Sequence, residues 1–165
     1  MVLLGCGLLL VVQAAVAGEG RGRSPTGAPP VVEPTVFGNL LVPVGRRLRF
    51  GFSLALLSLR THRECAALFS ELGADGLEVL AQTRYESASL DLLSGACGSG
   101  VPAYTKVGSY LIKLCPGFVA LSVRGAALTV IHEALHSAGL SEKPADQATL
   151  TSREINRMVQ LNCGF

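Results

Sequence analysis

The sequence contains few aromatic and few charged residues, and this limits the partners it can have. Tryptophan is absent, aromatic residues make up 5% and charged residues 16% of the 165 residues, and the formal net charge is +2. No basic stripe with interleaved aromatic residues is present, so we expect no nucleic-acid partner. The local basic cluster of Arg46, Arg47, Arg49 and Arg60 is interpreted as a solvated face.

Two common catalytic signatures are also missing. The glycines between Gly73 and Gly100 are spaced too irregularly for a phosphate-binding loop. No serine has the surroundings of a nucleophile elbow. No internal repeat is visible.

The first 17 residues contain no Lys or Arg, but they carry an apolar run followed by Ala15-Val16-Ala17. This pattern predicts a secretory signal peptide over residues 1–17. The run is short for a membrane span of about 20 residues, so no stable membrane insertion is expected after cleavage. Cys6 follows Leu-Leu-Gly as in a lipoprotein acceptor site, but almost no apolar segment precedes it. We therefore expect a secreted or periplasmic, cell-envelope protein.

Residues 18–36 are rich in Gly, Pro and small polar residues, and we expect a flexible leader there. Residues 37–165 have the length of one domain. Apolar spacing predicts one or two helices over Leu54–Leu72 closed by Gly73, and a strand over Leu77–Thr83. The remaining expected elements are two strands (Val101–Thr105 and Ser109–Cys115), a helix over Arg124–Ala138 and a final helix over Ile155–Leu161 with a capping box from Thr151. This order predicts an α+β fold.

Only four cysteines follow the predicted signal peptide, and an even number in an exported chain predicts two disulfides. Three connectivities are possible. We favour Cys97–Cys115, which would join the ends of a local β region. Cys65–Cys163 would then hold the C-terminal segment against an early helix. The spacings do not resemble a Cys-rich zinc site, although a single Cys ligand is a minor alternative.

The segment His132-Glu133-Ala-Leu-His136 carries the clearest chemical pattern in the chain. Two histidines four residues apart project from one helix face and can bind one metal ion, while Glu133 is placed to act as a general base. The flanking residues 129–131, 134–135 and 137–138 are uncharged, as a buried metal-binding helix requires. The alternative is an ordinary helix that carries two histidines.

This segment resembles the zincins, the His-Glu-x-x-His zinc metallopeptidases. Its continuation to Gly139-x-x-Glu142 is similar to the metzincin motif, in which Gly breaks the helix and a third ligand follows. Upstream, Tyr104-Thr105 and Ile112–Phe118 are similar to deuterolysin-like aspzincins, although their Gly-Thr-x-Asp segment is absent. The resemblance covers about Val101 to Glu142 and implies a small zincin-like domain with a short sheet, an active-site helix and a C-terminal helix.

The resemblance implies a Zn²⁺ cofactor with three protein ligands. Glu142 is the first choice for the third ligand, Glu154 the second and Asp146 the third. Tyr104 or Tyr110 could donate a hydrogen bond to the oxyanion, although a tyrosine in a strand more often serves packing. Met158 could correspond to the metzincin methionine turn, but its helix pattern favours a core position. His62 is interpreted as a surface residue.

The sequence therefore predicts an exported zinc metalloendopeptidase that acts on a peptide or protein substrate, with Glu133 as general base. One alternative is a zincin-like scaffold of the cell envelope that binds zinc or a partner without cleaving it. Another is a structural domain whose histidines bind no metal.

Overall fold

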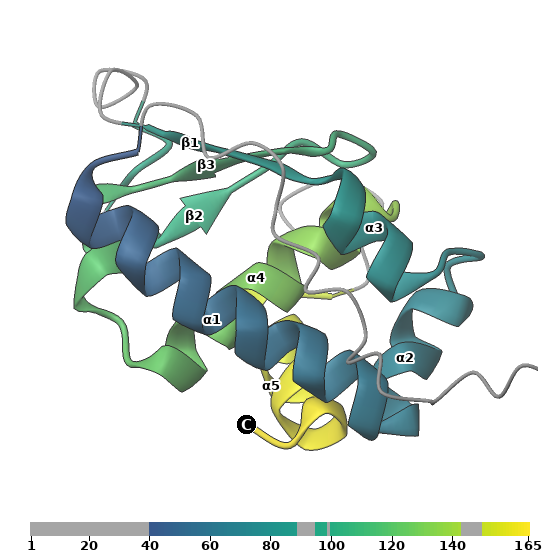
Figure 1. Ribbon diagram of the computed structural model, residues 1–165. Coiled ribbons are helices and arrows are strands. Elements are labelled where there is room, and N and C mark those ends of the chain that lie inside the picture. The colour runs from purple at the N-terminus through teal and green to yellow at the C-terminus, as the bar shows by residue number, and fades with distance from the viewer. Residues whose placement is uncertain (1–39, 89–94, 99, 143–149) are drawn as a thin grey trace, which may run out of the picture. The chain divides into compact units, whose positions relative to one another are not determined.

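The computed structural model describes residues 40–88, 95–98, 100–142 and 150–165, and all of them belong to one compact unit (Figure 1). The predicted signal peptide and leader lie outside the described residues. The fold is α+β, as predicted from the sequence. No helix in the described part of the chain has the length and apolar character needed to cross a membrane.

The longest helix, α1 (Val42–Thr61), begins earlier than the predicted Leu54 because Pro43 occupies its first turn, where a missing N–H costs nothing. It ends at His62, and α2 (Arg63–Ser70) follows directly. Gly73, with φ 74°, closes the turn after α2.

The expected strand over Leu77–Thr83 is wrong, because α3 (Gly76–Gln82) occupies this segment. The Asp75 carboxylate accepts hydrogen bonds from the N–H groups of Leu77 (2.8 Å) and Glu78 (3.1 Å) and so caps a new helix. The strand begins at the residue after the predicted segment, as β1 (Arg84–Ser87), which was not predicted from the sequence.

The described sheet has three strands in the order β1-β3-β2. Strand β3 (Leu111–Leu114) pairs parallel with β1 and antiparallel with β2 (Ala103–Tyr104). Strands β2 and β3 lie within the two predicted strand segments, Val101–Thr105 and Ser109–Cys115. Strand β2 therefore lies at one edge of the described sheet, next to α4 (Val123–Ser137) (Figure 1).

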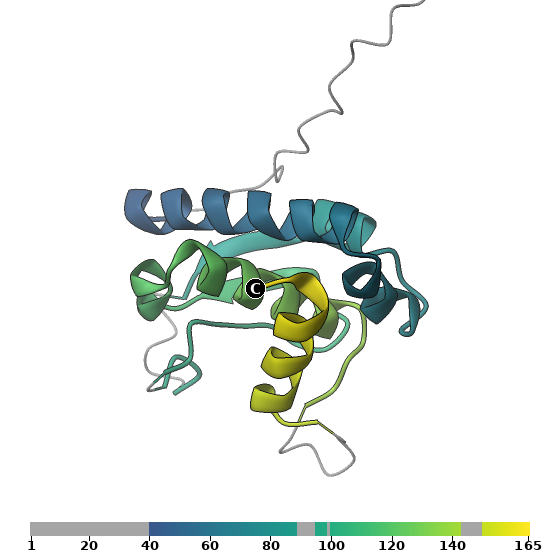
Figure 2. The same ribbon diagram turned by 90° about the horizontal axis from the view of Figure 1, so that it is seen from below.

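Helix α4 lies at the centre of the fold. It packs against α1 on one side and against α5 (Ser152–Cys163) on the other, as the view from below shows (Figure 2). Every residue of α4 from Ala126 onward is buried except Leu128, which is half-buried. The short 3₁₀ helix η2 (Pro116–Ala120) leads into α4.

Two disulfides hold this arrangement together, with the connectivity favoured from the sequence. Cys65 in α2 is bonded to Cys163 in α5, and Cys97 is bonded to Cys115 at the end of β3. The predicted capping box of α5 is present: Thr151 Oγ1 accepts from the Glu154 N–H, and Glu154 Oε2 accepts from the Thr151 N–H.

Candidate metal centre

Helix α4 presents His132 and His136 on one face. The Ser122 hydroxyl caps the helix by accepting a hydrogen bond from the Gly125 N–H (3.0 Å). Four residues correspond to about one turn, so the two imidazoles lie one above the other. Their Nε2 atoms are 3.0 Å apart, and both side chains are almost fully buried.

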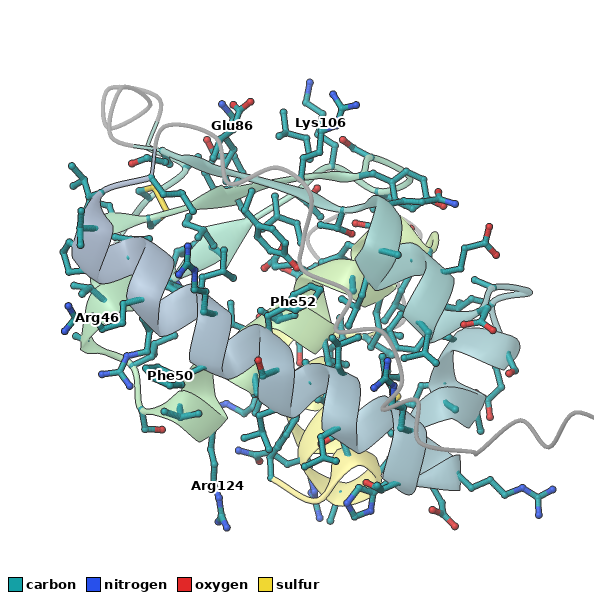
Figure 3. All side chains as sticks on the ribbon, in the orientation of Figure 1. Arg46, Phe50, Phe52, Glu86, Lys106 and Arg124 are labelled. Carbon is teal, nitrogen blue, oxygen red and sulfur yellow. A yellow bond between two sulfur atoms is a disulfide. The ribbon has the colours of Figure 1, made fainter. Side chains whose placement is uncertain are left out.

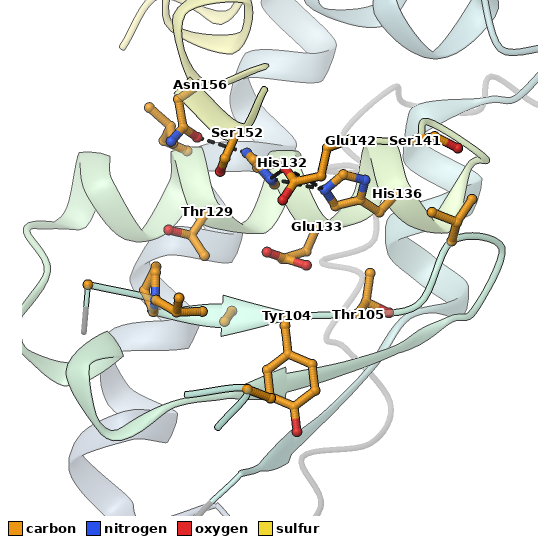
Figure 4. A pocket seen from close by; sticks show the side chains of 17 residues that line it. Tyr104, Thr105, Thr129, His132, Glu133, His136, Ser141, Glu142, Ser152 and Asn156 are labelled. Carbon is orange, nitrogen blue, oxygen red and sulfur yellow. Dashed lines mark hydrogen bonds and ion pairs between the residues drawn. The ribbon is translucent and has the colours of Figure 1, made fainter. Parts of the chain in front are cut away.

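The turn after α4 brings Glu142 to the two histidines. Gly139 adopts φ 110°, a backbone conformation that favours glycine, and the chain reverses there. Glu142 Oε2 consequently lies 3.3 Å from His132 Nε2 and 3.4 Å from His136 Nε2. The Nε2, Nε2 and Oε2 atoms form a compact triangle (Figure 4).

The outer nitrogens of both imidazoles are held by oxygen acceptors. His136 Nδ1 lies 2.7 Å from the Leu140 carbonyl oxygen, and His132 Nδ1 lies 2.8 Å from Asn156 Oδ1. These oxygens can only accept, so in each neutral ring Nδ1 carries the proton. The lone pairs of both Nε2 atoms are therefore directed into the triangle. Burial lowers the pKa of His132, and the charge of His136 lowers it further, which favours the neutral form that binds metal.

The triangle has the dimensions of a metal-binding site. In a tetrahedral site with bonds of about 2.0–2.1 Å, two ligand atoms lie about 3.3 Å apart. The three observed separations are 3.0, 3.3 and 3.4 Å. Glu142 Oε2 is buried without a hydrogen-bond donor in the described residues, although it faces two nitrogens. A shared cation would satisfy all three atoms, and their tetrahedral arrangement would leave a fourth position open.

Glu133 lies beside this triangle, between α4 and β2 (Figure 4). Its carboxylate accepts a hydrogen bond from the backbone N–H of Thr105, while Oε2 has no hydrogen-bond partner among the described residues. Burial raises the pKa of Glu133 to about 8, and the negative charge of Glu142 adds to this effect. A buried base with such a pKa is suited to proton transfer near neutral pH.

A cleft of about 560 Å³ opens onto these groups. One wall is the segment 100–105, which includes β2, and the other is formed by α4 and the first turns of α5 (Figure 4). Apart from Glu133 and Glu142, the described residues that line the cleft include no carboxylate, and they include no Lys or Arg.

The remaining site candidates occupy different places. Tyr104 lines the cleft, but its ring extends from β2 on the side away from Glu133 (Figure 4). Tyr110 is exposed and lies in a separate depression beside α3. Glu154 is exposed in the capping box of α5 and is not part of the His132–His136–Glu142 group. Asp146 lies outside the described residues.

Two further residues agree with their sequence-based interpretation as non-ligands. Met158 is partly buried and packs against the core. His62 is exposed between α1 and α2, next to Gly164.

The sequence analysis missed three groups that support the site: the Asn156 side chain, the Leu140 carbonyl and the Thr105 N–H. The latter two belong to the backbone, so no side-chain pattern could identify them. Asn156 follows the Thr151 cap on the first turns of α5. The contact of Asn156 with His132 depends on the packing of α5 on α4, which the sequence pattern does not show.

Comparison of the chain with protein-family models, with curated proteins and with solved structures finds no match. The function is therefore inferred from the geometry of this site.

Proposed function

We propose that this chain is a zinc-dependent metallopeptidase that hydrolyses peptide bonds without a covalent intermediate. The observation that carries the proposal is the convergence of His132 Nε2, His136 Nε2 and Glu142 Oε2 at separations of 3.0–3.4 Å. Two imidazoles and one carboxylate are a ligand set typical of catalytic zinc sites, which keep one position for water or substrate.

A zinc ion bound there would polarise the scissile carbonyl and make a water molecule a better nucleophile. Glu133 would accept the proton of the attacking water and return it to the leaving amine. Its unpartnered Oε2 and its position beside the triangle support this role. Asn156 and Leu140 would keep both imidazoles in the metal-binding tautomer throughout.

The substrate would be an extended peptide added to the sheet edge. The Pro102 carbonyl points to β3, where it accepts a hydrogen bond from the Cys115 N–H. Because the backbone groups of successive residues in a strand point to opposite sides, the N–H and carbonyl of Ala103 point away from β3 and towards the cleft. A peptide strand pairing there would run past the triangle. Ala103→Pro removes the N–H that would pair and should raise KM for peptides while zinc content stays unchanged.

The two disulfides support activity in an oxidising compartment, outside the cytoplasm. This agrees with export as expected from the N-terminal segment.

The test begins with zinc content per chain in the purified, signal-less protein, measured for wild type and His136→Ala. We expect about one zinc in wild type and its loss in the variant. Peptide turnover is then compared between wild type and Glu133→Gln, which should keep zinc and lose activity. If wild type binds no zinc even after reconstitution, the proposal fails.

A non-catalytic zinc- or partner-binding protein is the second candidate. It is favoured by the direction of the Tyr104 ring, which points away from Glu133, so that its hydroxyl is not placed to donate a hydrogen bond to an oxyanion beside that carboxylate. Zinc bound at one per chain, together with no turnover of any peptide in a mixed library, would select this function.

A further inference from the structure

A second surface lies where α1 and α4 begin. A groove of about 550 Å³ runs between the first turns of α1 and the η2–α4 junction. In Figure 3, Arg46, Phe50 and Arg124 lie at this end of the molecule. We call this surface the α1 groove, and its lining residues are Val42, Pro43, Arg46, Arg47, Phe50, Val119 and Val123.

The α1 groove collects exposed apolar side chains. Ten large hydrophobic residues are exposed in the described part of the chain, and four of them line this groove: Val42, Phe50, Val119 and Val123. Val42 is 77% and Phe50 56% exposed, although burial of side chains of this size is favourable. Contiguous apolar exposure of this kind typically marks an interaction surface.

The charge around the groove has one sign. No Asp or Glu occurs between Pro34 and Arg63 or between Pro116 and His132, so both walls lack acidic residues. Arg46 and Arg47 line the groove, and Arg124 follows at the start of α4. None of these three forms an ion pair with a described residue. Their guanidinium groups can therefore bind an external anion.

The exposed positions form a stripe along α1. Val42, Arg46 and Phe50 are spaced by four residues, and Leu57, which is 54% exposed, follows two turns later. A stripe with apolar and cationic side chains side by side is typical of helices that lie in a membrane interface, where the apolar groups enter the acyl boundary and the cations meet phosphates. Nucleic acid would complement the positive charge of the Arg residues, but it would leave the exposed valines and Phe50 without an apolar partner.

We propose that the α1 groove docks the domain on the anionic surface of a lipid bilayer. The chemistry of the groove supports this occupant: Val42, Phe50 and Val123 suit the acyl boundary of a bilayer, and Arg46 and Arg47 beside them complement lipid phosphates. Docking is peripheral and inserts no helix across the membrane. It does not depend on zinc or on peptidase activity.

The test is co-sedimentation of the signal-less protein with vesicles of equal parts phosphatidylglycerol and phosphatidylcholine, or of phosphatidylcholine alone. Wild type should bind the mixed vesicles, more weakly at high salt, and bind pure phosphatidylcholine little. Arg46→Gln with Arg47→Gln should weaken binding about 30-fold, since each Arg contributes about 1 kcal/mol near such a surface. Phe50→Ser should weaken binding about tenfold.

Matched controls lie on α5. Arg153→Gln with Arg157→Gln makes the same charge change at exposed positions, and Leu161→Ser removes a side chain that is 74% exposed. Both controls should bind like wild type.

No binding of wild type to the mixed vesicles overturns the proposal, and so does an equal loss in the α5 controls. Self-association that Phe50→Ser abolishes, without any vesicle binding, would assign the groove to a second copy instead. Binding of duplex DNA through Arg46 and Arg47, without vesicle binding, would likewise overturn it.

Discussion

The Nδ1 atom of His132 lies 2.8 Å from the Oδ1 atom of Asn156, so that a candidate metal ligand on α4 is oriented by a side chain on α5. A hydrogen bond of this kind fixes both the tautomer and the direction of the ring. Asn156→Ala removes the acceptor and should weaken zinc binding about 10–100-fold. The measurement is competition for zinc with a chromophoric chelator.

Asn156→Asp keeps an oxygen acceptor and should retain most of the zinc affinity. Gln160→Ala, an exposed change on the same helix, should leave the affinity unchanged. If Asn156→Asp loses as much zinc affinity as Asn156→Ala, then loss of the orienting hydrogen bond does not explain the weaker zinc binding of Asn156→Ala.

The identity of the third ligand can be decided with a pair of glutamates. Glu142→Ala should lower zinc affinity by more than about 100-fold, because loss of a direct ligand costs more than loss of an orienting group. Glu154→Ala should leave the affinity unchanged and should lower the free energy of unfolding by about 0.5–1 kcal/mol through loss of the capping box. Zinc titrations and urea unfolding of both variants separate the two effects. A reversal of this pattern would make Glu154 the ligand.

The sequence was sufficient to predict the parts of the site that are close together along the chain. His132, His136 and Glu142 lie on one helix and the turn after it, so helix periodicity and Gly139 already place them together. Asn156 reaches His132 from another helix. Its contribution depends on how α5 packs on α4, and no local spacing encodes that.

The errors in predicted elements also have local causes. The three arginines Arg46, Arg47 and Arg49 interrupt the apolar pattern of α1, so its first three turns were not predicted. In α3, the apolar residues Leu77, Val79 and Leu80 suggested a strand, but the capping carboxylate of Asp75 directs the chain into a helix.

The two disulfides should contribute unequally to stability. The Cys65–Cys163 bond spans 98 residues and the Cys97–Cys115 bond spans 18. In the chain-entropy description, a loop of about 100 residues corresponds to about 4.7 kcal/mol and one of about 15 residues to about 3 kcal/mol. We expect Cys65→Ala with Cys163→Ala to lower the free energy of unfolding more than Cys97→Ala with Cys115→Ala. Urea unfolding of the zinc-free proteins measures this, and equal losses would contradict it.

Helices α1 and α4 approach each other at Gly51, where packing leaves no room for a side chain. A Cβ at this position would lie 2.7 Å from Ala126 Cβ and 2.9 Å from the Ala126 carbonyl carbon, so the backbones would have to separate. Gly51→Ala should therefore destabilise the fold by about 1–3 kcal/mol despite the better helix propensity of alanine. Gly45, on the same helix, is the matched control, since the nearest atom to its added Cβ is 3.9 Å away. Gly45→Ala should stabilise by about 0.5–1 kcal/mol. Urea midpoints that shift in the same direction for both variants would show that close packing at Gly51 does not limit the distance between the two helices.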